Sequence, residues 1–204
     1  MSYVMTSDFE LQTRIQRLYA ALSSLTEQPA SRTLVNQTDE GIPVFRLELP
    51  PGNCTHFEMM NFVQTAIGLL AHFPEHLKRA IRANRRDPSF IDPYIDGSVE
   101  LRVLIDLANT EKHGPNKRDK GRSGFDPQLG RVKPMLQLTV SSVGSSASIS
   151  SSSGLKAVGD GEAARTIDGD ILDKDGAYKL RLRQTLDTAT NVLGAMLKEA
   201  DVKF

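Results

Sequence analysis

The segment VELRVLIDLANTEKH, residues 99–113, constrains the fold of this chain more than any other stretch. As a helix with about 100° per residue, it is apolar on most sides. Four of its polar side chains fall within an arc of about 60° and are called the polar stripe here: Arg102, Asp106, Asn109 and His113. A helix that is apolar around most of its surface must pack against neighbours on most sides. The rest of the chain therefore has to supply elements that cover it.

Three further segments have the apolar spacing of amphipathic helices: 7–26, 55–86 and 178–200. The first two open with capping boxes, which are Ser7 with Glu10 and Thr55 with Glu58. Pro74 is expected to break or kink the second helix, with a basic helix continuing after it. With the stripe helix, 98–113, which Ser98 should cap and Gly114 should end, these segments predict a helical core.

Strand-like patterns occupy two other parts of the chain. The runs RTLVNQ and IPVFRLEL flank TDEG, which predicts an N-terminal β-hairpin. After residue 131 apolar and polar residues alternate, and short β-like runs follow a serine-rich stretch, which predicts an antiparallel sheet over about residues 130–174. We therefore predict an α+β fold in a single domain of residues 1–204. Its helical core carries the N-terminal hairpin and an antiparallel sheet inserted before the C-terminal helix.

The composition indicates a protein that folds without disulfides. Hydrophobic residues make up 39% of the 204, enough for a buried core. Cys54 is the only cysteine, so no intramolecular disulfide can form, which suits a reducing compartment. The N-terminus lacks a basic stretch followed by an apolar run, and Asn61 and Gln64 interrupt the most apolar segment. We therefore expect a cytoplasmic protein that does not enter a membrane.

Basic residues cluster along the chain, although 25 basic and 25 acidic residues leave no net charge. Residues 76–86 and 112–122 together hold ten of the 25 basic side chains. Such clusters can follow a phosphate backbone, and equally can be solvated faces. If they bind nucleic acid, the candidate contacts are Arg82, Arg85, Lys117 and Arg118.

The polar stripe has two interpretations. In the functional one, His113 transfers protons near neutral pH, Asn109 orients a substrate oxygen, and Arg102 or Lys112 stabilises negative charge. The catalytic candidates are His113, Asn109, Arg102 and Asp106. In the structural one, Arg102 and Asp106 form an i, i+4 ion pair and His113 lies favourably at the negative end of the helix. Because unpaired charges are costly to bury, we expect the stripe to line a groove that solvent can reach.

The end of the stripe helix resembles known sequences. Asn-Thr-Glu-Lys-His, residues 109–113 after LIDLA, is similar to the N-x-x-K-H helix end of many uncharacterised bacterial proteins and to the motif helix of HEPN domains. HEPN domains are helical bundles, often dimeric, and many are metal-independent ribonucleases of toxin–antitoxin and phage-defence systems. Their motif is an arginine followed by a polar residue, with a histidine four to six residues after the arginine. The resemblance implies motif roles for His113 and Asn109, whereas Ala108 stands in place of the arginine.

Two other patterns resemble metal sites without predicting one. His72, Glu75 and His76 match the H-x-x-E-H pattern of inverted zinc peptidases, but Pro74 interrupts the helix that would align them and no third ligand is evident. The run DGDILDKDG does not follow the EF-hand order, and an Asp-Gly turn between a strand and the last helix fits it better. We therefore predict neither a metal ion nor a cofactor.

The leading hypothesis is an RNA-directed HEPN-like protein that either cleaves RNA or binds it without cleavage. The rival is a non-enzymatic protein-interaction module, such as a homodimer that pairs its helices, in which the stripe is structural. The sequence leaves open whether the chain is an enzyme. The two hypotheses differ in whether the stripe lines a concave surface with both basic segments at its rim.

Overall fold

A computed structural model describes residues 3–27, 34–39, 42–48, 55–114, 121–139, 146–150, 154–158 and 162–201. The chain forms two compact units, each built from segments that are distant in sequence. The first comprises Met1–Leu22, Gln64–Gly130 and Gly169–Phe204, and the second comprises Ser23–Val63 and Arg131–Asp168. The α+β fold class is confirmed, with helices, antiparallel sheets and a C-terminal helix after the sheet. The expectation of a single domain over residues 1–204 stays a prediction.

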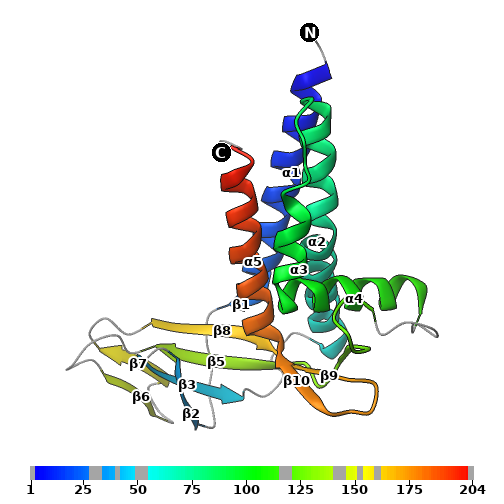
Figure 1. Ribbon diagram of the computed structural model, residues 1–204. Helices are drawn as coiled ribbons and strands as arrows, with labels where there is room; N and C mark the ends of the chain where they lie inside the picture. The colour runs from blue at the N-terminus through cyan, green and yellow to red at the C-terminus, as the bar shows by residue number, and fades with distance from the viewer. Residues whose placement is uncertain are drawn as a thin grey trace. The chain divides into compact units, whose positions relative to one another are not determined.

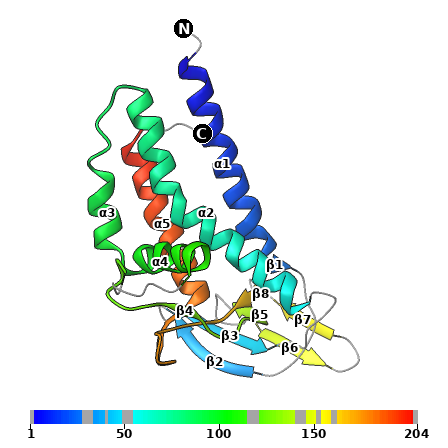
Figure 2. The ribbon, with the colours of Figure 1, turned by 90° about the vertical axis from the view of Figure 1, so that its right-hand side faces the viewer.

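Five helices lie wholly or largely in the first unit: α1 (Tyr3–Ser24), α2 (His56–Ala83), α3 (Ile91–Gly97), α4 (Val99–His113) and α5 (Leu182–Glu199). Figures 1 and 2 show α4 lying crosswise to α2, and α4 contacts both α3 and α5. Leu101, Val103 and Leu104 of α4 are completely buried, as the apolar pattern of residues 99–113 predicts. The core of this unit is built around α4 by large buried side chains from the other elements, including Leu70, Phe73, Leu77, Ile91, Ile95 and Ile171.

Helix α2 differs from the prediction in two respects. The first is that Pro74 lies inside the helix and does not break it. Proline removes one helical donor, but the neighbouring Phe73 and Leu77 are buried, and their packing holds the helix through this position. The helix ends at Ala83 instead of near residue 86, because Arg85 has a positive φ of 57°. The N–H of Arg86 then bonds back to the carbonyl of Ile81 at 3.0 Å, which closes a Schellman turn.

The other helices begin partly where the sequence predicts and partly elsewhere. Helix α1 begins at Tyr3, ahead of the predicted cap at Ser7. The second capping box is confirmed, since Thr55 N–H donates to Glu58 Oε2 at 2.7 Å and Glu58 N–H donates to Thr55 Oγ1 at 3.2 Å. Helix α3 was not predicted. It is a short separate helix that contributes the buried Ile91 and Ile95.

The first unit also contains a small antiparallel sheet with strand order β10-β9-β4. Its strands are β4 (Gln128–Leu129), β9 (Asp170–Leu172) and β10 (Tyr178–Arg181). The last helix therefore starts at Leu182, later than predicted, because residues 178–181 pair with β9. The expected Asp-Gly turn is present, but it joins β9 to β10 instead of joining a strand to the last helix. Asp173 Oδ1 accepts from Ala177 N–H at 2.9 Å, and Gly176 has a φ of 82°.

The second unit contains a five-stranded antiparallel sheet with order β1-β8-β5-β3-β2 (Figure 1). Its strands are β1 (Thr26–Glu27), β2 (Leu34–Asp39), β3 (Ile42–Glu48), β5 (Lys133–Thr139) and β8 (Glu162–Asp168). The predicted N-terminal hairpin is confirmed, with Asp39 paired to Ile42. The hairpin is not separate from the later sheet, because β3 pairs with β5. A two-stranded ribbon, β6 (Ser146–Ser150) and β7 (Gly154–Val158), lies between β5 and β8 in the chain.

No helix among the described residues is long and apolar enough to cross a membrane.

Candidate functional site

Helix α4 holds the polar stripe, and its two ends form as the sequence predicts. The Ser98 hydroxyl caps the N-terminus by accepting a 3.1 Å hydrogen bond from Leu101 N–H. Gly114 follows the last helical residue with a φ of 77°, a conformation that glycine adopts without a Cβ clash. With its apolar sides buried, α4 presents the stripe toward residues 121–127, which return to it after the helix ends.

Asp106 is the most constrained residue of the stripe. Its side chain is buried, with 7% of the residue exposed, and its carboxylate accepts three hydrogen bonds from the returning loop. The donors are Arg122 N–H at 3.0 Å, Ser123 N–H at 2.7 Å and the Ser123 hydroxyl at 2.6 Å. Charge-assisted bonds of this kind are stronger than neutral ones. We call the hydrogen bonds of Asp106 with Arg122 and Ser123 the Asp106 clasp. The clasp holds the loop against α4 and uses most of the hydrogen-bond acceptor capacity of the carboxylate.

Gly121 makes this clasp possible. Its φ is 69°, and a Cβ built at this position would overlap the Asp106 carboxylate, reaching 2.7 Å from Oδ1. Only a residue without a side chain fits both the backbone conformation and the space. The glycine in the sequence Lys-Gly-Arg-Ser therefore marks the point where the loop backbone meets α4.

Arg102 lies apart from the rest of the stripe. The guanidinium Nε donates to the carbonyl of Ser98 at 3.3 Å, one turn back on its own helix. Among the described residues Arg102 forms no ion pair with Asp106, because the carboxylate faces the loop. The ion pair of the structural interpretation is therefore absent, although both residues have structural bonds.

The other two stripe residues are exposed and line an open pocket. We call it the stripe pocket; its volume is about 370 Å³, and it is lined by Asp106, Asn109, Thr110, His113, Gly114, Gly121, Phe125, Asp126 and Pro127. The prediction that the whole stripe lines a groove that solvent reaches is met by three of its four residues and is wrong for Arg102, which is not among the lining residues. The pocket places an imidazole, a carboxamide, a hydroxyl and two carboxylates around one space.

A second pocket adjoins the first. We call it the Arg122 pocket; its volume is about 620 Å³, and it is lined by Ala71, His72, Pro74, Glu75, Ile95, Ile105, Asp106, Asn109, Gly121 and Arg122. Asp106, Asn109 and Gly121 belong to both pockets. The sequence patterns joined His72 and Glu75 but not Arg122, because only the packing of α2 against α4 and the loop brings Arg122 to them. The one usable signal was the clustering of basic residues after His113.

The basic segment of α2 is divided between structural and exposed residues. Lys78 is buried, with 7% exposed, and its ammonium group bonds to Glu75 at 3.0 Å and to Asp92 at 2.8 Å. Burial alone would lower the pKa of Lys78, but the hydrogen bonds to Asp92 and Glu75 outweigh it and raise that pKa. Arg86 donates to the carbonyl of Ala200 at 2.6 Å.

The predicted nucleic-acid contacts are placed only in part. Arg82 and Arg85 are exposed, as binding to a phosphate backbone requires. Lys117 and Arg118 lie outside the described residues. Two of the four predicted contacts are therefore exposed to a ligand, Arg82 in α2 and Arg85 in the turn that follows the helix.

The metal-like patterns show no metal centre among the described residues, where no group of three potential ligands is found. His72 is exposed, and the pKa of His76 is lowered by burial and then by Arg14 and Arg79. Glu75 is bonded to Lys78. His72 and Glu75 thus line the Arg122 pocket, whereas His76 is not among its lining residues.

Comparison of this chain with family models, curated proteins and solved structures finds no match.

Proposed function

We propose that this chain binds RNA at the stripe pocket, with His113 as the proton-transfer residue and Asn109 as the residue that orients the phosphate. The proposed contacts to the rest of the phosphate backbone are Arg82, Arg85, Lys117 and Arg118. The observation that carries the proposal is the division of the stripe. The carboxylate of Asp106 is hydrogen-bonded to the loop, while Asn109 and His113 remain exposed on the same side of α4 and line one pocket. The resemblance of residues 109–113 to the HEPN motif helix supports RNA as the ligand.

The chemistry suited to these groups is cleavage without a metal ion. An imidazole exchanges protons near neutral pH, and a carboxamide can donate to a phosphate oxygen. In the proposed step His113 takes the proton of a ribose 2′-hydroxyl, the 2′-oxygen bonds to phosphorus, and the bond to the 5′-oxygen breaks. Water protonates the departing 5′-oxygen, and the product is a cyclic phosphate. Ala108 in place of the motif arginine predicts a slow reaction, because that position supplies no positive charge to the transition state.

The test of cleavage uses mixed RNA in EDTA, which silences contaminating metal-dependent nucleases. His113→Ala should reduce cleavage by roughly 10²–10⁴-fold, the usual contribution of a positioned acid–base group. Because His113 is exposed, the melting temperature should stay unchanged. Asn109→Ala should also lower the rate, whereas His56→Ala, at an exposed histidine outside the pocket, is the matched control. Wild-type protein that leaves all RNA intact at high concentration would refute cleavage.

Binding is tested separately by titrating labelled RNA at several salt concentrations. Reversal of charge at Arg82, Arg85, Lys117 and Arg118 should weaken binding regardless of RNA sequence, and affinity should fall steeply with salt because counterions are released on binding. Arg17→Glu, at an exposed arginine of α1, is the control for net charge. Binding that is absent at low salt, or insensitive to salt, would remove RNA from consideration.

A second candidate function rests on a different observation. Asp106 and Arg102 both make structural bonds, as expected if the stripe serves the fold of an interaction module that is not an enzyme. Such a module could pair with a second copy of itself. Light scattering separates this candidate from the first: a dimer that binds no RNA, and that His113→Glu dissociates, would favour it.

A further inference from the structure

The Arg122 pocket has three kinds of lining residue, of which the sequence patterns connected only His72 and Glu75. Its floor is apolar, with Ala71, Pro74 and Ile95 buried and Ile105 half-buried. Hydrogen-bonding side chains come from His72 and Asn109. Three charged groups complete it, the Glu75 carboxylate from α2, the Asp106 carboxylate from α4 and the Arg122 guanidinium from the loop. Asp106 already accepts three hydrogen bonds from the loop, so Glu75 and Arg122 are the charged groups of the pocket that can pair with a ligand. A pocket with an apolar floor and a few polar groups is typical of small-molecule sites.

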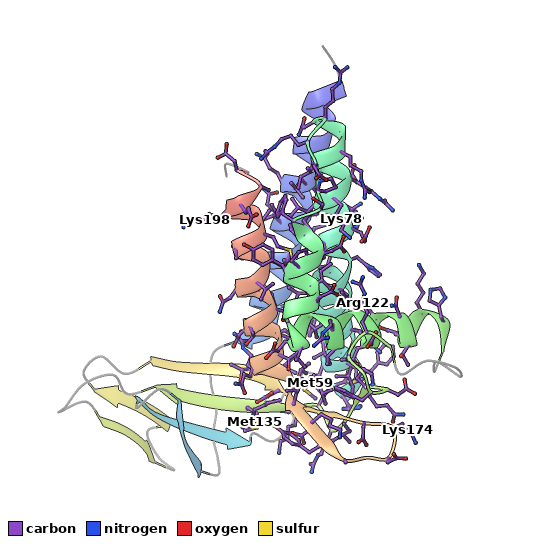
Figure 3. All side chains as sticks on the ribbon, in the orientation of Figure 1. Met59, Lys78, Arg122, Met135, Lys174 and Lys198 are labelled. Atoms are coloured by element: carbon purple, nitrogen blue, oxygen red, sulfur yellow. The ribbon has the colours of Figure 1, made fainter. Side chains whose placement is uncertain are left out.

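The position of Arg122 is fixed by the Asp106 clasp. Its backbone N–H is one of the three donors to Asp106, so the residue is anchored at its main chain while its side chain is exposed (Figure 3). Among the described residues the guanidinium forms no ion pair. Its charge helps to lower the pKa of Asp92, which is lowered first by the hydrogen bond from Lys78 and to a smaller extent by Arg122. The guanidinium therefore keeps its donors for a ligand.

Glu75 is held differently. Its carboxylate bonds to the buried Lys78 at 3.0 Å, and its side chain is 57% exposed. Lys78 also bonds to Asp92, so Lys78 and Arg122 together balance Glu75 and Asp92. With Asp106 included, three carboxylates stand against two positive groups, but Asp106 is saturated by its bonds to the loop. One positive and one negative group, Arg122 and Glu75, therefore remain to pair with a ligand in this space.

We propose that the Arg122 pocket binds a free α-amino acid with an apolar side chain. The ligand carboxylate pairs with Arg122 and Asn109, its ammonium group pairs with Glu75, and its side chain covers the apolar floor. A simple anion would leave Glu75 facing a like charge, and a simple cation would do the same to Arg122. A zwitterion satisfies both groups without changing the net charge. The inference does not depend on RNA binding.

The size of the pocket favours the larger apolar amino acids. At about 620 Å³ it lies within the range of small-molecule sites. Leucine, isoleucine, methionine and phenylalanine bring enough apolar surface to displace water from the floor, whereas glycine does not. Leucine is therefore the first probe.

The experiment is calorimetric titration of the full chain with leucine and with three probes that each lack one recognised group. Isocaproate lacks the ammonium group, isoamylamine lacks the carboxylate and glycine lacks the side chain. Leucine should bind saturably, and each probe should bind at least about tenfold more weakly, the effect of one lost charge-assisted bond or buried apolar side chain. No saturable binding of any of the four apolar amino acids at about 10 mM would overturn the proposal. Equal binding of isocaproate and leucine would overturn it as well.

Variants locate the site. Arg122→Gln and Glu75→Gln should each weaken leucine binding at least about tenfold. Both positions are exposed, and Glu75→Gln leaves Lys78 its bond to Asp92, so the melting temperature should stay close to that of the wild type. Arg17→Gln is the matched control. His113→Ala should retain leucine binding, because His113 lines only the stripe pocket. Unchanged affinity in Arg122→Gln would place the ligand elsewhere and refute the assignment, whatever the outcome of the RNA assays.

Discussion

Asp106→Ala tests the central structural claim, that this stripe residue is a clasp for the loop. The change removes the acceptor of two backbone N–H groups and one hydroxyl. Each bond to a charged acceptor contributes about 1.5–3 kcal/mol. Arg122 is exposed and Ser123 is half-buried, so water replaces part of what is lost, and a total cost of about 3 kcal/mol is expected. At about 2–4 °C per kcal/mol for a chain of this size, the melting temperature should fall by about 6–12 °C.

The assay combines thermal unfolding with amide hydrogen exchange. In the wild type the Ser123 amide should be protected by its bond to Asp106, and Asp106→Ala should remove that protection. Gly121→Ala provides an independent check, because its Cβ overlaps the carboxylate of Asp106. In the Asp106→Ala background that overlap disappears, so Gly121→Ala should cost at least about 1 kcal/mol less than in the wild type. A melting temperature of Asp106→Ala within about 2 °C of the wild type, with strictly additive costs, would refute the clasp.

Three other predictions follow from single positions. Arg85→Gly should raise the free energy of unfolding by about 0.5–1 kcal/mol in chemical denaturation, because Arg85 has a positive φ that glycine adopts without penalty; a loss of stability would contradict this. In the wild type the bond to Lys78 lowers the pKa of Asp92, so in Lys78→Met that pKa should return toward 3.8 in an NMR titration. The stability that the wild type gains from this bond should be present above pH 3.8 and lost below it. The lowered pKa of His76 means that the unfolded state binds its proton more readily than the folded state, so wild-type stability should fall as the pH drops below 6.5. His76→Gln should lose this dependence when the free energy of unfolding is compared at pH 8 and pH 5. An identical pH profile in the variant would assign the dependence to other groups.

The sequence by itself determined the local elements of this protein. The Thr55–Glu58 capping box, the Ser98 cap and the turn at Asp173 all form, because each depends on groups within four residues of one another. The burial of α4 was also readable, since a helix that is apolar on most sides has to be covered whatever covers it. The prediction that His113 and Asn109 reach solvent succeeded for the same reason, as they stand on its one polar side.

The tertiary structure decided which partner each polar group received. Asp106 could bond to Arg102 one turn away or to a loop many residues later, and the chain path selected Arg122 and Ser123. Likewise, β3 pairs with β5 across a long separation, which no hairpin signal encodes. The Arg122 pocket exists because α2, α3, α4 and the returning loop pack together, and the spacing of residues along the chain does not specify that packing. Local bonds are set by neighbours in sequence, whereas the bonds of Asp106 depend on the path that brings distant backbone donors to a buried carboxylate.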